Sequence, residues 1–198
     1  VIRSLSLPAP PTDASSTSTS RQVQEACQQA FEYADVTPAN IGYLELYGGI
    51  DQENARSLEA SVAEGLNLAY HTTESTVSCG LGSVHAEASP SSAMASLIKT
   101  ILCLNQRYIP PTSNGSSMAA SLEHRGDTPF YVETKSRTWF LDEGASIRWA
   151  AINVLETDGS LAHVILSDAP DGQDDRTPSL RRKQRDIHYL QNVDVHLF

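Results

Sequence analysis

The thiols, which could act as nucleophiles or hold a structural zinc ion, are few and scattered in this sequence. Cys27, Cys79 and Cys103 are odd in number and far apart, without a Cys-x-x-Cys pair. This pattern argues against a disulfide framework and a structural zinc site, and it favours a reducing, cytoplasmic setting. Cys103 stands between two leucines, which is typical of a small core residue, and Cys79 could line a cavity. We expect no bound metal.

Four other residues, which belong to the motifs described below, have side chains that can transfer a proton or carry a charge. They are Tyr47, His85, Glu87 and His163. Tyr47 ends an apolar run, Glu87 stands just before a helix-like segment, and His163 lies inside an apolar run. Each has an ordinary explanation. A tyrosine at a strand end is often half-buried with its hydroxyl in water, a carboxylate near a helix start is favoured by the helix dipole, and a histidine in a core strand is usually a hydrogen-bonded core residue. These residues alone assign no reaction.

Composition limits the class of protein. The 198 residues, 40% of them hydrophobic, suit one domain with a sizeable core. The formal net charge of -10 opposes binding to nucleic acid or to anionic lipid. No apolar run approaches the ~18 residues of a membrane span, and no basic leader is present. We expect a soluble, cytoplasmic protein.

Both ends of the sequence fall within strand-like alternation. Val1 opens a pattern of alternating apolar residues without an initiator Met, and 193–198 alternates again and then stops. We therefore expect this chain to be part of a longer polypeptide.

The elements that must position the candidate residues alternate between strand and helix. The Pro/Ser/Thr-rich stretch from Pro8 to Ser20 predicts a mobile loop, with Ser20 as the N-cap of the helix that follows. Helices are expected at about 20–35, 51–65 and 89–105, the last largely buried, and strands at 1–7, 41–47, 75–80, 130–132, 147–155 and 161–166. The last two strands predict a hairpin. This order is typical of an α/β fold with a mixed sheet covered by helices.

Five short motifs occur in the order of a known family. They are Leu44-Glu45 after Ala34–Tyr43, Leu81-Gly82-Ser83-Val84, Leu97-Ile98-Lys99-Thr100, Ile109-Pro110-Pro111-Thr112, and Ala162-His163-Val164-Ile165-Leu166 before Ala169-Pro170. Together they resemble the C-terminal half of a β-ketoacyl synthase, the condensing domain of fatty acid and polyketide synthases. The resemblance implies a thiolase-like lobe with a mixed five-stranded sheet over residues 1–170, followed by a post-ketosynthase linker over 171–198.

The family's catalytic positions differ in this sequence. Its cysteine nucleophile belongs to the N-terminal half, which this chain lacks. Its two histidines assist decarboxylation of a malonyl thioester and donate hydrogen bonds to developing negative charge. Motif alignment puts Tyr47 in place of the first and Glu87 in place of the second, and Glu156–Leu161 replaces a glycine-rich turn. His85 is a possible substitute imidazole if the shortened segment is re-registered.

This combination resembles the chain-length factor, a non-catalytic ketosynthase-like partner, in the version found in polyunsaturated fatty acid and polyketide-type synthases. The resemblance implies no catalytic residue and no directly bound cofactor. It implies that this chain pairs with an active ketosynthase and forms part of the wall of a long apolar acyl tunnel, whose depth limits the product length. It implies three partners: an active ketosynthase domain, the missing N-terminal lobe, and an acyl carrier protein with a phosphopantetheine-linked chain.

Two alternatives stay open. One is an active β-ketoacyl synthase that uses His85 in decarboxylative condensation, and the other is an interaction scaffold without an acyl tunnel. The identity of the residue at the nucleophile position, which lies outside this chain, would distinguish an active synthase from an inactive one. In every case, we expect the isolated chain to expose apolar surface and to be poorly soluble.

Overall fold

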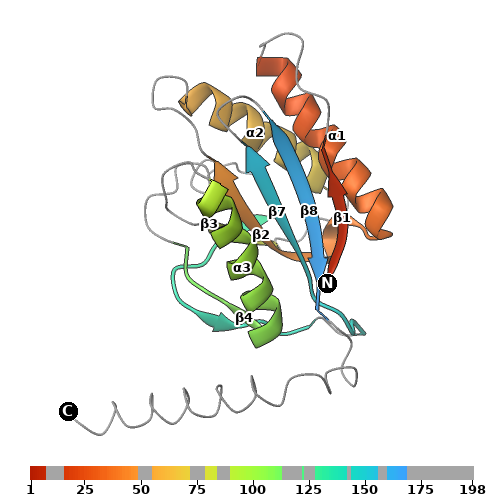
Figure 1. Cartoon of the computed structure of the whole chain (residues 1–198), viewed down its shortest axis with the longest axis vertical. Coiled ribbons are helices and arrows are strands. Elements are labelled where there is room, and N and C mark those ends of the chain that lie inside the picture. Colours follow the sequence, from red (N-terminus) through yellow and green to blue (C-terminus); the bar gives the residue numbers. More distant parts are fainter. Residues whose placement is uncertain are drawn as a thin grey trace, which may run out of the picture. The chain divides into compact units, whose positions relative to one another are not determined.

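Strands and helices alternate along the chain as the hydrophobic pattern predicts (Figure 1). The computed structural model describes residues 1–7, 16–48, 55–71, 79–83, 90–112, 122, 128–141, 144–155 and 160–168. The helical elements are α1 (Ser16–Ala34), the 3-10 turn η1 (Pro38–Asn40), α2 (Ala55–Tyr70) and α3 (Pro90–Gln106). The strands are β1 (Ile2–Ser6), β2 (Ile41–Gly48), β3 (Cys79–Ser83), β4 (Tyr108–Ile109), β5 (Phe130–Val132), β6 (Arg137–Thr138), β7 (Trp149–Leu155) and β8 (Leu161–Ser167).

The main sheet is mixed, as expected. Its strand order is β1-β8-β7-β2-β3-β5, in which β7, β2, β3 and β5 run parallel and β8 is antiparallel to both of its neighbours. The antiparallel pairing of β7 with β8 confirms the predicted hairpin. The expectation of five strands is wrong, because the described strands form a sheet of six in which the three-residue β5 pairs along the outer edge of β3.

A second, two-stranded sheet was not expected. It pairs β4 with β6, whose two residues are both exposed. A strand this short and exposed has no alternation of apolar and polar residues from which it could be predicted.

Helices cover the two faces of the main sheet, α1 and α2 on one and α3 on the other (Figure 1). The larger core cluster lies under α1 and α2 and includes Val23, Phe31, Leu44, Leu66 and Ile165. A smaller cluster under α3 includes Tyr43, Cys103 and Ile152. Alternate residues of β2 therefore enter different cores, as the two-residue period of a strand requires.

α1 begins four residues before the predicted N-cap, so the placement of Ser20 at the start of the helix is wrong. Ser20 lies within the helix and is buried. Ser20 packs closely on α2, where a Cβ built on Gly65 would overlap the Ser20 carbonyl and crowd Val23. Only a glycine permits this close approach, and the helix pairing extends α1 into the Ser/Thr-rich stretch. α2 also continues past its predicted end, because Ala69 and Tyr70 are buried.

α3 matches its predicted bounds, but the expectation that it is largely buried is wrong. Met94, Ile98, Ile101 and Leu102 are 45–55% exposed. The buried residues of α3 are mostly small or polar, namely Ser96, Thr100 and Cys103, with Leu104 as the large apolar member. The helix therefore keeps an apolar outer face that the described part of the chain does not cover.

The two ends of the compact unit Val1–Asp168 meet. The main-chain nitrogen of Val1 lies 2.7 Å from the Ser167 carbonyl oxygen, and the Ser167 amide donates to the Val1 carbonyl at 2.9 Å. This pairing follows from the position of β1 at the sheet edge beside β8.

Candidate functional site at the carboxyl ends of the parallel strands

The strands that precede the three altered family motifs end at one edge of the sheet. β2, β3 and β7 are parallel, with Leu46 opposite both Ser83 and Asn153, and Gly48 opposite Leu155. The carboxyl ends of parallel strands are where open α/β sheets bind ligands. Both His85 and Glu87, and the turn at 156–159, lie outside the described residues, so their side-chain positions stay predictions.

Of the candidate residues that the structure describes, Tyr47 lies closest to this edge. It pairs with Val154 of β7 and is only 2% exposed. Because side chains alternate along a strand, Tyr47 shares a face with Tyr43 and Glu45, on the α3 side of the sheet. Tyr47 is therefore buried, unlike the half-exposed tyrosine that is common at strand ends.

Beneath this edge lies a buried charge on the same face of β2. The Glu45 side chain is fully buried, and its Oε2 accepts hydrogen bonds from the Tyr43 hydroxyl at 2.6 Å and from Lys99 Nζ at 2.8 Å. Burial and then the Glu45 carboxylate raise the pKa of Tyr43 well above its usual range, so the phenol stays protonated and donates.

Glycine makes room for these groups. A Cβ on Gly82 would overlap the Tyr43 hydroxyl and the Glu45 carboxylate. The Lys99 ammonium also donates to the Ser83 carbonyl, 3.3 Å away. This cluster was not predicted as a unit, although a glutamate inside the otherwise apolar run 41–47 was the available indication.

His163 is fully buried on the opposite face, as expected of a core histidine. Its Nδ1 lies 3.3 Å from Asn153 Oδ1, and its Nε2 lies 3.2 Å from the Tyr70 hydroxyl. Cys27 Sγ also lies 3.4 Å from Nδ1. In the tautomer with the proton on Nδ1, the ring donates to Asn153 Oδ1 and the Tyr70 hydroxyl donates to Nε2. Desolvation lowers the pKa of His163 to about 3, so the ring is neutral at physiological pH.

The three thiols are all buried. Desolvation raises the pKa of Cys27 and Cys79 far above their usual range and that of Cys103 to about 11. This confirms Cys103 as a core residue and gives none of the thiols the environment of a nucleophile. Among the residues that the structure describes, no group of three or more His, Cys, Asp or Glu side chains could hold a metal ion.

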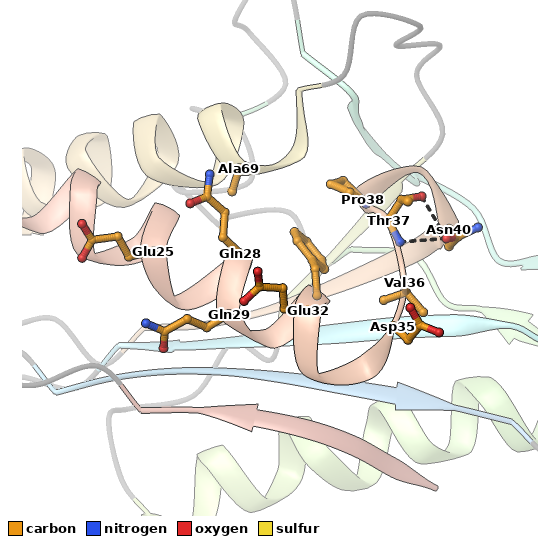
Figure 2. Close-up of a pocket in the computed structure, with 11 residues that line it drawn as sticks. Glu25, Gln28, Gln29, Glu32, Asp35, Val36, Thr37, Pro38, Asn40 and Ala69 are labelled. Carbon is orange, nitrogen blue, oxygen red and sulfur yellow. Dashed lines mark hydrogen bonds between the residues drawn. The ribbon is translucent and has the colours of Figure 1, made fainter.

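A separate depression lies at the other end of β2 (Figure 2). It measures about 750 Å³ and is lined by the end of α1, by η1 and by Ala69. Thr37 closes its rim, where its amide and hydroxyl both contact Asn40 Oδ1 at 2.9 Å. Because η1 leads into the amino end of β2, this depression is distinct from the strand ends where the candidate residues converge.

Comparison with known proteins agrees with this architecture. The profile of the beta-ketoacyl synthase C-terminal domain matches residues 9–116. A phenolphthiocerol/phthiocerol polyketide synthase polypeptide of Mycobacterium tuberculosis is 34% identical over 149 residues, which are 72% of this chain and 9% of that protein. A polyunsaturated fatty acid synthase polypeptide of Thraustochytrium is 29% identical over 160 residues, 73% of this chain and 8% of that protein.

Solved structures agree as well. An oxazolomycin ketosynthase domain from Streptomyces albus superposes with a TM-score of 0.71 at 26% identity, over 87% of this chain and 31% of that chain. A bacillaene synthase ketosynthase from Bacillus subtilis superposes with a TM-score of 0.71 at 20% identity, over 86% of this chain and 32% of that chain, and so supports the fold. This chain thus spans a small part of its curated relatives and about a third of the solved ketosynthases. No helix in the described part of the chain is long and apolar enough to cross a membrane.

The matching profile, the parallel strands that end together and the superposition on solved ketosynthases lead to one assignment. The chain belongs to the beta-ketoacyl synthase C-terminal domain family and has the thiolase-like mixed α/β fold of that half of a ketosynthase.

Proposed function

We propose that this chain is a non-catalytic, chain-length-factor-like part of a multidomain fatty acid or polyketide synthase. The observation that carries the proposal is Tyr47, a buried phenol at the end of β2 where the family motif has a histidine. A phenol can donate a hydrogen bond, but with an ordinary pKa of about 10 it is a poor base near neutrality. On motif alignment Glu87 takes the place of the second histidine, and its charge would repel a malonyl carboxylate.

The apolar outer face of α3 supports pairing with the rest of a ketosynthase. Four large apolar side chains of α3 are about half exposed, namely Met94, Ile98, Ile101 and Leu102, and Leu5 on β1 is also 51% exposed. Exposed apolar surface of this kind marks an interaction site. The solved ketosynthases have about three times the length that this chain matches, so the proposed occupant is the N-terminal lobe. An active ketosynthase domain and a phosphopantetheine-bearing acyl carrier protein are the other proposed partners.

The competing function is an active β-ketoacyl synthase. It depends on His85, which comes two residues after β3 in the sequence. The carboxyl end of β3 is paired with β2, the strand that carries Tyr47. An imidazole there could donate a hydrogen bond to a developing oxyanion.

The two functions separate in an assay of the complete synthase. The measurement is malonyl-thioester decarboxylation together with the length of the acyl product, for the wild type, His85→Ala and Tyr47→Phe. A non-catalytic domain predicts decarboxylation unchanged by either substitution, and a shifted product length when bulky residues replace the tunnel lining. A loss of decarboxylation of about 100-fold or more in His85→Ala, the size expected for a general acid–base group, would establish the active synthase instead.

A further inference from the structure

Three elements meet at the ammonium of Lys99, below the candidate site. Glu45 belongs to β2, Lys99 to α3, and the carbonyl that shares the Lys99 ammonium belongs to Ser83, the last residue of β3. The α3 helix is thereby joined to the end of β3 as well as to the middle of β2.

The geometry suits a compact cation. Lys99 Nζ lies 2.8 Å from Glu45 Oε2, 3.3 Å from the Ser83 carbonyl oxygen and 5.9 Å from the centroid of the Tyr43 ring. An ammonium is a point charge with three donors that can serve both oxygens at once, whereas a planar guanidinium is matched to one carboxylate.

Stability alone does not account for this ion pair. Glu45 is fully buried and the Lys99 side chain is 22% exposed. Removing a carboxylate and an ammonium from water costs nearly as much as their attraction returns, so an uncharged pair of similar volume is often as stable. What an uncharged pair would lack is the charge-assisted hydrogen bond to Ser83.

We propose that Lys99 is a positioning residue, which holds the carboxyl end of β3 in register beside the carboxyl end of β2. His85 and Glu87 follow directly after that end of β3, and Tyr47 lies at that end of β2. The inference depends on the proposed function only in treating this edge as the functional one.

The test separates positioning from stability by means of a paired substitution. Lys99→Met alone leaves a buried carboxylate unpaired and lowers the melting temperature of the domain. Glu45→Gln with Lys99→Met removes both charges, keeps an acceptor for Tyr43, and brings the melting temperature back close to that of the wild type. Lys99→Arg, which keeps the ion pair, is the second variant, and Lys135→Met, at an exposed lysine, is the control.

The decisive readout is amide hydrogen exchange of the β3 residues 79–83 in the complete protein. We expect about tenfold faster exchange at the carboxyl end of β3 in the paired variant despite its restored melting temperature, and faster exchange in Lys99→Arg, because a charge-assisted hydrogen bond is lost in both. Exchange at the wild-type rate in the paired variant would overturn the proposal and reduce the pair to a structural contact.

Product analysis keeps the two proposals distinguishable. Faster β3 exchange together with an altered acyl product length supports both. Faster β3 exchange with unchanged products supports the positioning role and counts against the treatment of this edge as the functional one. Unchanged exchange overturns the positioning role whatever the products are.

Discussion

At the residue scale, burial decides which polar groups of this lobe can do chemistry. His163 has the imidazole that catalysis would need, yet it is enclosed by Cys27, Tyr70 and Asn153 and is neutral. Tyr47 lies at the edge that we propose as the functional one, yet it has no basic nitrogen. The imidazole and the site are therefore in different places within the described residues.

His163 gives a prediction about pH. Its pKa is about 3 in the folded state, against an ordinary value of 6.5, so below pH 6.5 the unfolded chain binds a proton that the folded chain does not. Stability is therefore complete above about pH 6.5 and falls as the pH drops toward 3, by about 1.4 kcal/mol per pH unit.

Denaturant unfolding of the ketosynthase domain at pH 7.0 and pH 5.0 tests this expectation. The wild type should lose about 2 kcal/mol more than His163→Gln over that interval, because about 1.5 pH units separate the ordinary histidine pKa from pH 5.0. Equal losses in the two proteins would show that His163 is not the titrating group.

The cysteines give a second prediction at this scale. Because the three thiols are buried and desolvation raises their pKa, we expect them to react with a thiol reagent at least about 100-fold more slowly in the folded chain than in denaturant. The measurement is the time course of labelling with each cysteine identified by mass spectrometry. Rapid labelling of Cys79 in the folded protein would instead indicate an accessible cavity.

At the element scale, close approaches by glycine set the helix positions. A Cβ on Gly65 would overlap the Ser20 carbonyl, so we expect Gly65→Ala to destabilise the domain by about 1–3 kcal/mol. This loss outweighs the gain of about 1 kcal/mol that alanine brings to a helix interior. Urea unfolding measures the difference. Glu64→Ala, at the exposed neighbouring position, is the matched control and should change stability by less than about 0.5 kcal/mol.

The presence of each main helix and strand was more predictable from the sequence than where it ends or what it packs against. Strands 41–47, 130–132 and 161–166 and helix 89–105 follow from apolar periodicity, which records only whether a residue fits a half-buried position. Periodicity could not give the start of α1, which depends on Gly65 in another helix, or the pairing of β4 with β6.

The candidate site was predictable to a different extent. Motif alignment identified Tyr47, and the structure adds that it is buried on the α3 side. The Glu45–Lys99–Ser83 contact joins residues 54 and 16 positions apart, a distance over which no local pattern extends. The exposed face of α3 was missed because periodicity identifies an apolar arc but not how much of it a neighbour covers.

At the scale of the whole molecule, the apolar face of α3 limits what the chain does alone. With Met94, Ile98 and Leu102 about half exposed, we expect the isolated 198-residue chain to associate at micromolar concentrations. Ile98→Lys combined with Leu102→Glu should shift it toward monomer without changing its circular dichroism. In the complete ketosynthase, the same pair of substitutions should weaken packing of the two lobes.

Gel filtration with light scattering measures both outcomes. A wild-type chain that is monodisperse and monomeric, and that unfolds cooperatively, would contradict the proposed lobe contact. As a control, Leu68→Glu changes an exposed leucine on α2, on the other face of the sheet, and should leave self-association unaltered.

The hydrogen-bonded pairing of Val1 with Ser167 has an engineering consequence. β1 is the edge strand of the sheet and β8 is its neighbour, so the two ends of the unit Val1–Asp168 lie side by side. The lobe should therefore tolerate circular permutation through a short linker that joins these two ends.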